Sequence, residues 1–531
     1  MARGGHPIRL IVGVLTVGGW TFGSRVLGFL RDILIAAFMG TGPVAEAFFV
    51  AFSLPNMFRR FFAEGAFNTA FVPLFSKKLE GGENAHAFAQ DAFSGLASLL
   101  IVLTLIAQVA MPWFVLAMAS GFANDARFEI ATYFGRIAFG YVIFISLAAL
   151  LSGVLNATGR FAAAAAAPIL LNVILIVALI MAEAGIAQNL TMPGAGHVLH
   201  LNHGTLLAVG TLVAGVAQMG LVWRAAARAG FRLVPRIPRW TPDMRRLAQI
   251  MAPAMLAGGV VQINLLVGRQ VASFFDGAIV WLNFADRLYQ LPLGMVGIAI
   301  GIVLLPDLSR RLRANDDTGA RAAFSRAGEL ALALTIPSAV ALCVIPAPLV
   351  AVLFERGAFE PADTAATALA VAAYGIGLPA FVLQKVLQPL YFAREDTRRP
   401  FLYAVIAMGV NAGVAIGLAW GVGYLGAALG TTVAGWAMVW LLLRGRRAMG
   451  AVAYFDARFR RRIVRITAAA CIMGGFCWGT ARVLDPVLVL AGWRYLALGG
   501  LIIGGVLVYG AAGHVLGAFR LSEFRAALRQ P

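Results

Sequence analysis

Residues 99–118 read LLIVLTLIAQVAMPWFVLAM and contain no charged side chain. A helix of about 20 apolar residues is long enough to cross the hydrocarbon core of a bilayer. The rest of the chain has the same character, since 60% of its 531 residues are hydrophobic and only 13% are charged. A soluble protein of this length needs more polar surface than that composition supplies. The sequence therefore predicts an all-α polytopic membrane protein, and it excludes a disordered chain, a coiled coil and a disulfide scaffold.

Fourteen segments are long and apolar enough to be spanning helices. Several exceed 25 residues, so we expect tilts, kinks or breaks within them. The predicted spans cover residues 8–38, 44–75, 87–119, 126–156, 162–186, 204–224, 247–275, 278–305, 322–345, 363–393, 400–420, 424–443, 463–484 and 493–518.

The basic residues of the loops predict the orientation of these spans. If the N-terminus lies inside, the inside loops and termini, counted with the adjoining ends of the spans, hold 31 Lys and Arg residues. The outside loops, counted in the same way, hold 4, which are Arg127, Arg356, Arg482 and Arg494. Cytoplasmic loops are rich in Lys and Arg, so both termini are predicted to lie in the cytoplasm. Most of the basic residues behind the net charge of +19 then lie where they set the orientation of the spans. A nucleic-acid partner is not indicated.

The chain resembles itself at offsets of 232 to 237 residues. The sequence PLFSKKL at 73–79 returns as PDLSRRL at 306–312, and Pro112 near the end of the third span corresponds to Pro346 near the end of the ninth. Six spans per repeat predict two lobes related by a pseudo-two-fold axis along the membrane normal, with a site between them. We expect an N-lobe over 1–230, a C-lobe over 231–450, and two extra helices with a cytoplasmic tail over 451–531.

The predicted spans contain more basic than acidic side chains. A charge inside a bilayer is costly unless it faces water, a partner or a ligand. The basic residues are Arg25, Arg31, Arg59, Arg60, Arg136, Arg269, Arg287 and Lys385. The clear acids are Asp32, Glu46, Glu64 and Asp286.

This positive surplus favours an anionic substrate over a cationic drug. An arginine grips phosphate with paired donors and stays charged at any relevant pH. Arg25, Arg31 and Arg287 lie on the first and eighth spans, and we expect them to hold a phosphate or diphosphate on an amphiphile with a lipid tail. The alternative for these three is internal pairing, as for Arg31 beside Asp32.

A second group of charges, at the end of the second span, has a structural explanation as well as a functional one. Arg60 and Glu64 are one helical turn apart, so they can pair along the helix. With Arg59 they form either part of the cavity or a structural clasp near the inner face of the membrane.

Nothing in the sequence indicates an enzyme or a bound cofactor. There is no phosphate-binding Walker loop and no Ser/His/Asp set in the outside loops. His197, His200 and His203 lie in one outside loop, where a solvated loop is the ordinary explanation and a metal site the alternative. Cys343, Cys471 and Cys477 lie in apolar runs and indicate neither disulfides nor a metal site.

Several motifs resemble those of the MurJ (MviN) family of lipid II flippases, in order and spacing from the first to the twelfth span. They are SRVLGFLRD at 24–32, AFFVAFSLPNMFRRFFAEGAF at 47–67, ADRL at 285–288, FERGAF at 354–359 and AREDT at 393–397. The resemblance implies the multidrug/oligosaccharidyl-lipid/polysaccharide (MOP) exporter architecture. It also implies alternating-access transport of lipid II, the undecaprenyl-diphosphate-linked peptidoglycan precursor, across a bacterial inner membrane.

The positions that match residues needed in the family follow from these motifs. Glu46 stands where the family often has Asp, and Gln290 stands where some members carry an acid, which leaves a proton or ion role there in doubt. The matching positions implied for substrate binding or gating are Ser24, Arg25, Arg31, Asn56, Arg59, Arg60, Glu64, Asp286 and Arg287.

The sequence is also compatible with two rival functions. A flippase for another polyprenyl-diphosphate-linked oligosaccharide would use the same cationic cavity. A polytopic glycosyltransferase would need a catalytic carboxylate outside, yet the longest outside loop, about 187–203, holds no Asp or Glu. We expect no cofactor, with a coupling ion or the membrane potential as the open energy source. We also expect a monomer among membrane lipids, with cell wall synthesis proteins as candidate partners.

Overall fold

The structure is a computed structural model. It describes residues 7–60, 67–186, 191–193, 198–200, 202–314, 316–488, 490 and 492–518. Within these residues the chain is built almost wholly of helices. Ten helical stretches there are long and apolar enough to cross a membrane by length and composition.

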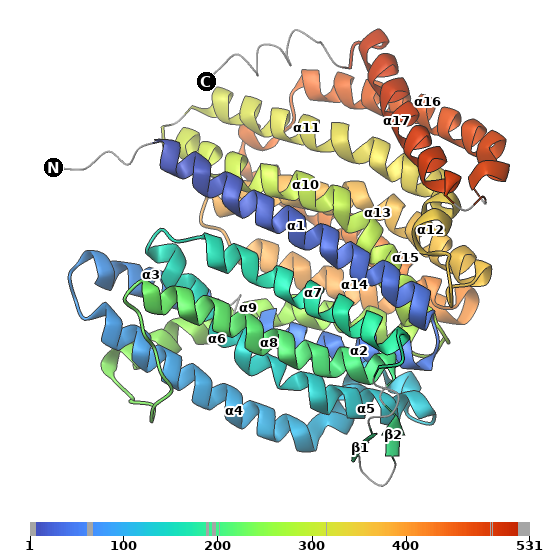
Figure 1. Ribbon diagram of the computed structural model, residues 1–531. Helices are drawn as coiled ribbons and strands as arrows, with labels where there is room; N and C mark the ends of the chain where they lie inside the picture. The colour runs from blue at the N-terminus through green and yellow to red at the C-terminus, as the bar shows by residue number, and fades with distance from the viewer. Residues whose placement is uncertain are drawn as a thin grey trace. The chain divides into compact units, whose positions relative to one another are not determined.

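The first half of the chain contains nine α-helices and two short strands among the described residues (Figure 1). They are α1 (Pro7–Met39), α2 (Pro43–Arg59), α3 (Asn68–Glu80), α4 (Ala85–Met118), α5 (Ala126–Phe139), α6 (Tyr141–Ala157), α7 (Ala162–Glu183), β1 (Thr191–Pro193), β2 (Val198–His200), α8 (His203–Arg228) and α9 (Pro242–Ala272). The strands β1 and β2 pair antiparallel, with Met192 opposite Leu199.

The second half consists of helices in the residues that are described. They are α10 (Ala278–Arg313), α11 (Asp317–Val344), α12 (Pro346–Phe354), α13 (Pro361–Phe392), α14 (Arg398–Val422), α15 (Leu425–Gly445), α16 (Ala457–Leu488) and α17 (Trp493–Val515). Short 3-10 turns occur at Ser120–Phe122, Arg446–Met449 and Ala451–Ala453.

Each of the fourteen predicted spans is helical over most of its described residues, so the predicted fold class is confirmed. The span predicted over 126–156 is divided at Gly140 into α5 and α6. The span predicted over 44–75 holds α2 and α3, with residues 61–66 outside the described chain.

Three details differ from the sequence prediction. Pro112 lies inside α4, which continues to Met118, whereas Pro346 opens the separate helix α12. The short α12 and the strand pair between α7 and α8 were not predicted, because their segments are too short for a clear hydrophobic period.

Sequence signals explain where many of these helices begin. Asn84, Asp125, Asn202 and Asp316 each stand before a helix and accept a backbone N–H with the side chain. At α13, Glu360 and Asp363 form a capping box around a proline at the first helical position.

The chain divides into two compact units, and each is described by itself. The first contains residues 1–266 with 356–359, and the second contains 267–355 with 360–531, so the division falls within α9. The predicted lobe limits at 230 and 450 stay a prediction. In the first unit α1 packs on α7 and α2 on α5, and in the second α13 packs on α10, α11 and α15.

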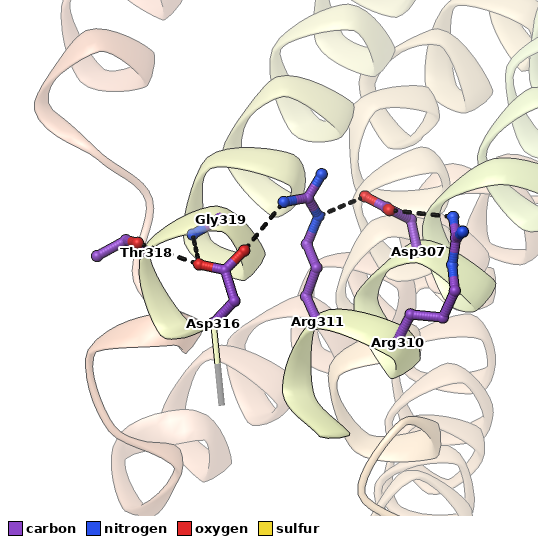
Figure 2. Close-up of polar contacts among 6 residues, drawn as sticks. All are labelled: Asp307, Arg310, Arg311, Asp316, Thr318 and Gly319. Carbon is purple, nitrogen blue, oxygen red and sulfur yellow. Dashed lines mark hydrogen bonds and ion pairs between the residues drawn. The ribbon is translucent and has the colours of Figure 1, made fainter. Parts of the chain in front are cut away.

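The repeated motif ends a helix in the same way in each unit. In the first unit Lys78 follows the motif's proline by five residues and pairs with Glu83 at 2.8 Å. In the second, Arg311 stands at the matching position and pairs with Asp316 at 3.1 Å (Figure 2). In both units the acid that is paired lies five residues after the base, which supports the internal repeat.

The second copy of this helix end is the more extensively bonded one. Figure 2 shows Arg311 between Asp307 and Asp316, with Arg310 also at Asp307. Asp316 accepts the backbone N–H of Gly319 at 2.8 Å. That hydrogen bond is the main reason that the pKa of Asp316 is lowered. The end of α10 and the beginning of α11 are thus held together by charge as well as by the helix cap.

Candidate functional site

The basic residue Arg31 lies in a buried polar network between α1 and α7. Its Nη2 is 2.6 Å from Oδ1 of Asp32, and its Nη1 donates to Oδ1 of Asn172 at 3.1 Å. Arg31 is 4% exposed and Asp32 is fully buried. Asn172 in turn donates its amide to the backbone oxygen of Ser24 at 2.9 Å and to its hydroxyl at 3.3 Å. The internal pairing considered for Arg31 therefore exists in this structure.

Arg25 differs from Arg31 although both lie on α1. Its side chain is exposed, and it makes no hydrogen bond or ion pair with any described residue. The guanidinium of Arg31, by contrast, also lies 5.7 Å from the ring centre of Phe52 on α2. The two predicted diphosphate ligands of the first unit thus include one enclosed arginine and one accessible arginine.

The predicted residues at the end of α2 are only partly described. Asn56 donates its amide to the backbone oxygen of Phe52 at 2.8 Å, as a polar side chain inside a helix often does. Arg59 is half-buried and Arg60 is exposed. Glu64 lies outside the described residues, so the clasp between Arg60 and Glu64 stays a prediction.

A second buried ion pair joins the beginnings of α2 and α5. Nη1 of Arg127 lies 2.7 Å from Oε2 of Glu46, and the two side chains are 7% and 1% exposed. The Nε of Arg127 is 2.5 Å from Oδ2 of Asp125, the cap of α5. Its guanidinium also lies 4.4 Å from the ring centre of Phe122. Glu46 thus has a named counter-charge, supplied by a residue that we expected in a loop outside the membrane.

The second unit has a polar contact at the corresponding place. Trp281, in the first turn of α10, donates its indole N–H to Oδ1 of Asp363 in the first turn of α13 at 2.9 Å. These positions follow Glu46 and Arg127 by 235 and 236 residues. The beginnings of two corresponding helices are therefore joined in each unit. In the first unit the contact is an ion pair, and in the second it is a hydrogen bond from a neutral indole to a carboxylate.

Asp286 and Arg287 lie together on α10, and both are half-buried. The amide of Gln290, one turn later, donates to Oδ2 of Asp286. Gln290 therefore contacts the one acid of the motif, although it brings no charge of its own. Whether Arg287 binds substrate stays a prediction.

Two residues on which these networks depend were not predicted from the sequence. Asn172 is an amide inside the apolar segment 162–183, and such a residue in a membrane helix is a signal for a buried hydrogen bond. Arg127 follows the cap residue Asp125 by two positions, which could have been read as a charge held at the edge of a helix. Neither signal names the partner, because the partners are 141 and 81 residues away.

The remaining basic residues and candidate metal ligands lie elsewhere. Arg136 is exposed and its Nε donates to the backbone oxygen of Gln108 at 3.1 Å. Lys385 is exposed on α13. Nε2 of His203 lies 3.1 Å from Oε2 of Glu183. His197 and the side chain of His200 do not belong to the part of the chain that the structure describes. The described part of the chain contains no cluster of three or more His, Cys, Asp or Glu that could hold a metal ion.

The fold of the chain is shared with a class of membrane transporters. A multidrug resistance MATE family transporter of the MOP superfamily, solved in an inward-facing conformation, matches 84% of this chain and 98% of its own with a TM-score of 0.61. The two sequences are 16% identical, so this likeness concerns the fold alone. The chain therefore has the MOP exporter fold, as its motifs implied.

The family within that class follows from the sequence comparisons. The model of the family described as lipid II flippase MurJ matches residues 35–492. A probable lipid II flippase MurJ of Rhizobium meliloti (strain 1021) is 42% identical over 525 residues, which cover 97% of this chain and 95% of that protein. A lipid II flippase MurJ of Burkholderia cenocepacia is 34% identical over 510 residues, which cover 91% and 94% of the two chains. The chain belongs to the lipid II flippase MurJ family.

A solved member of the family agrees with this assignment. The structure described as lipid II flippase MurJ in an inward closed conformation matches 97% of this chain and 99% of its own, with a TM-score of 0.77 and 25% identity. The chain is accordingly a multi-pass protein of the bacterial inner membrane and a transporter.

Proposed function

We propose that this chain flips lipid II from the cytoplasmic to the periplasmic leaflet of the inner membrane by alternating access. Membership of the lipid II flippase MurJ family supports lipid II over another polyprenyl-diphosphate-linked oligosaccharide. It equally disfavours the glycosyltransferase alternative. Two further points concern which residues hold the diphosphate and how its binding changes the conformation of the transporter.

The observation that carries the proposed binding is the accessible guanidinium of Arg25. It stands in the interior of α1, among exposed apolar side chains such as Phe22 and Val26, and it has no ion pair with a described residue. An arginine at membrane depth is expensive unless it faces water or an anion. A diphosphate offers oxygens for the two-pronged contacts that a guanidinium makes. We therefore assign Arg25 as the first contact of the diphosphate.

Arg31 is proposed to join the site in another conformation of the transporter. In the described state its guanidinium is held by Asp32 and Asn172. An incoming diphosphate competes with Asp32 for the same donors, so ligand binding and the arrangement of α1 against α7 become coupled. A ligand shifts an equilibrium only as far as its affinities for the two states differ, and this exchange of partners supplies such a difference.

The other candidate residues complete the proposed site. Arg287 is proposed as the residue of the second unit that contacts the diphosphate. Asp286, beside it, is proposed as the acid that modulates this contact. Ser24, Asn56, Arg59 and Arg60 are proposed to line the path of the polar headgroup, and Asp32, Glu46, Glu64 and Asp286 to hold or release the arginines. We further propose that a single chain suffices, that both termini lie in the cytoplasm, and that either an ion or the membrane potential supplies the driving force.

The test measures lipid II binding and flipping together with protein level. Full-length variants Arg25→Ala, Arg31→Ala and Arg287→Ala are reconstituted with fluorescent lipid II, and flipping is followed by quenching from one side of the vesicle. Arg136→Ala is the matched control, because it removes an exposed arginine from a spanning helix without touching the proposed site. Native mass spectrometry gives the lipid II dissociation constant for each variant.

We expect each of the three variants to lose flipping and to bind lipid II at least about tenfold more weakly. Arg25→Ala and Arg287→Ala should keep normal abundance, whereas Arg31→Ala should be less abundant because it removes the ion-pair partner of the buried carboxylate of Asp32. Lysine replacements should restore only part of the affinity, because a point charge lacks the fork of a guanidinium. Wild-type binding and flipping by Arg25→Ala would remove the observation on which the assignment rests. A loss that is equal for lipid II and for a polyprenyl diphosphate with an unrelated sugar would show that the arginines read the diphosphate alone.

A further inference from the structure

A basic pocket lies where α14 begins and α15 ends, within the second unit. Its volume is about 440 Å³. The two helices are antiparallel neighbours, because only Gly423 and Tyr424 connect them, and so the beginning of one meets the end of the other. The pocket is lined by Arg399, Tyr403, Leu441, Arg444, Gly445 and Arg447.

The charge of this pocket is strongly positive. Arg399 lies 3.4 Å from Asp396, in a contact that leaves its side chain 48% exposed. The guanidinium of Arg444 lies 5.3 Å from the ring centre of Trp440, which contributes no charge. Neither Arg444 nor Arg447 has an ion pair with any residue that the structure describes. Three guanidiniums and one carboxylate therefore leave an excess of two positive charges around one hollow.

The floor of the pocket is closely packed around Gly445. A Cβ at Gly445 would lie 2.2 Å from the hydroxyl of Tyr403 and 2.7 Å from that of Tyr391, so a larger residue there would have to displace these side chains. Tyr391 is fully buried and donates its hydroxyl to the backbone oxygen of Leu442 at 2.6 Å. This hydrogen bond fixes the wall, and the close approach of Tyr403 brings a phenolic hydroxyl to the lining of the pocket. A phosphate oxygen can accept from that hydroxyl as well as from the guanidiniums.

Exposed apolar side chains continue from the pocket along both helices. On α14 these are Phe401 and Leu402 in the first turn and Ile406 in the next, at 39%, 46% and 49% exposure. On α15 they are Trp440 and Trp436, at 57% and 41% exposure. Tryptophans are typical of the boundary between lipid tails and headgroups. A basic hollow at this boundary with an apolar surface beyond it is complementary to a lipid that has a charged headgroup and apolar acyl chains.

We propose that this pocket binds the phosphate of an anionic membrane phospholipid, whose acyl chains lie along the exposed faces of α14 and α15. Basic pockets between spanning helices bind anionic headgroups in this way. The predicted orientation places the pocket in the cytoplasmic leaflet, where anionic lipids attract clustered arginines. A free phosphate ion would use the guanidiniums but would gain nothing from the apolar border, so a lipid is the better fit.

The experiment titrates the purified full-length chain with phosphatidylglycerol or phosphatidylcholine, counting bound lipids by native mass spectrometry. The test variant is the triple change Arg399→Gln, Arg444→Gln and Arg447→Gln. A matched control removes three exposed arginines from the connection between α8 and α9 and the start of α9. The control changes are Arg232→Gln, Arg239→Gln and Arg245→Gln.

The wild-type chain should bind one phosphatidylglycerol in preference to phosphatidylcholine. Each basic residue near an anionic lipid contributes about a fivefold gain in affinity, so the triple variant should lose about a hundredfold. The control variant should keep the preference. If the triple variant is unstable, Arg447→Gln alone should lose about fivefold, and Tyr403→Phe should weaken binding while leaving every charge in place.

Three results would overturn the proposal. The first is unchanged phosphatidylglycerol affinity in the triple variant or, where that variant is unstable, in Arg447→Gln. The second is displacement of phosphatidylglycerol by millimolar inorganic phosphate, which would make this a site for free anions. The third is one-for-one displacement by lipid II, which would make it a part of the substrate path.

Discussion

The buried pair of Glu46 and Arg127 gives a prediction whose size follows from its geometry. The two charged groups lie 2.7 Å apart, with side chains 1% and 7% exposed, so water screens them little. Arg127→Met keeps most of the side-chain volume but removes the guanidinium beside a buried carboxylate. Breaking a buried pair from one side costs about 3–5 kcal/mol. The contact with Asp125, whose side chain is 37% exposed, adds little to that sum.

The assay is the free energy of unfolding in micelles, measured by denaturant titration. A loss of about 3–5 kcal/mol corresponds to roughly two to three and a half powers of ten in the folding equilibrium. Arg136→Met is the control, because this arginine is exposed on the same helix and its Nε bonds only a backbone oxygen among described residues. We expect that control to lose less than about 1 kcal/mol.

The double variant Glu46→Gln with Arg127→Met completes a double-mutant cycle. It removes the buried charge together with its partner, so it should be more stable than Arg127→Met alone. If Arg127→Met unfolds within about 1 kcal/mol of the wild type, or if the double variant is no more stable than the single one, the ion pair does not stabilise the junction of α2 and α5 as argued.

The other predictions concern topology, pH and backbone conformation. A cysteine at Gly421 should react with an impermeant thiol reagent added to intact cells and one at Arg236 should not, and the reverse pattern would overturn the predicted orientation. Because the pKa of Asp316 is lowered in the folded chain, its capping of α11 should stabilise that helix above the ordinary pKa of about 4 and be lost as the pH falls through the folded value. Hydrogen exchange of the first turn of α11 should therefore rise on acidification in the wild type, and Asp316→Asn should abolish that pH dependence. Gly40→Ala should destabilise the chain by about 1–3 kcal/mol in thermal unfolding, because Gly40 has φ +57° and a Cβ there would lie 2.3 Å from a backbone oxygen of the 356–359 loop.

Local features of the sequence were sufficient to predict the spanning helices and the internal repeat. The apolar runs give the fourteen spans because the bilayer sets their length, whatever each helix packs against. The caps Asn84 and Asp316 are local as well, since a cap bonds its own helix three residues on. The repeated PLFSKKL and PDLSRRL motifs led to helix ends with the same pairing, because each base meets an acid only five residues away.

The partners of the membrane charges could not be predicted in the same way. Arg31 beside Asp32 was visible in the sequence, but Asn172, 141 residues later, completes the network. Arg127 was expected in an outside loop and proves to be the counter-charge of Glu46, 81 residues before it. The basic pocket between α14 and α15 likewise needs Arg399 and Arg444 to converge from the ends of two helices.

By itself, then, the sequence determined that this chain is a many-span membrane protein with an internal repeat, an excess of basic residues on one side, and the motifs of a flippase family. Only the tertiary structure decided which arginines are neutralised inside the protein and which are exposed. The reason is that hydrophobic length and loop charge act on each segment separately. The pairing of two buried charges, in contrast, depends on how each helix is rotated and placed against its neighbours, and packing over the whole unit sets that arrangement.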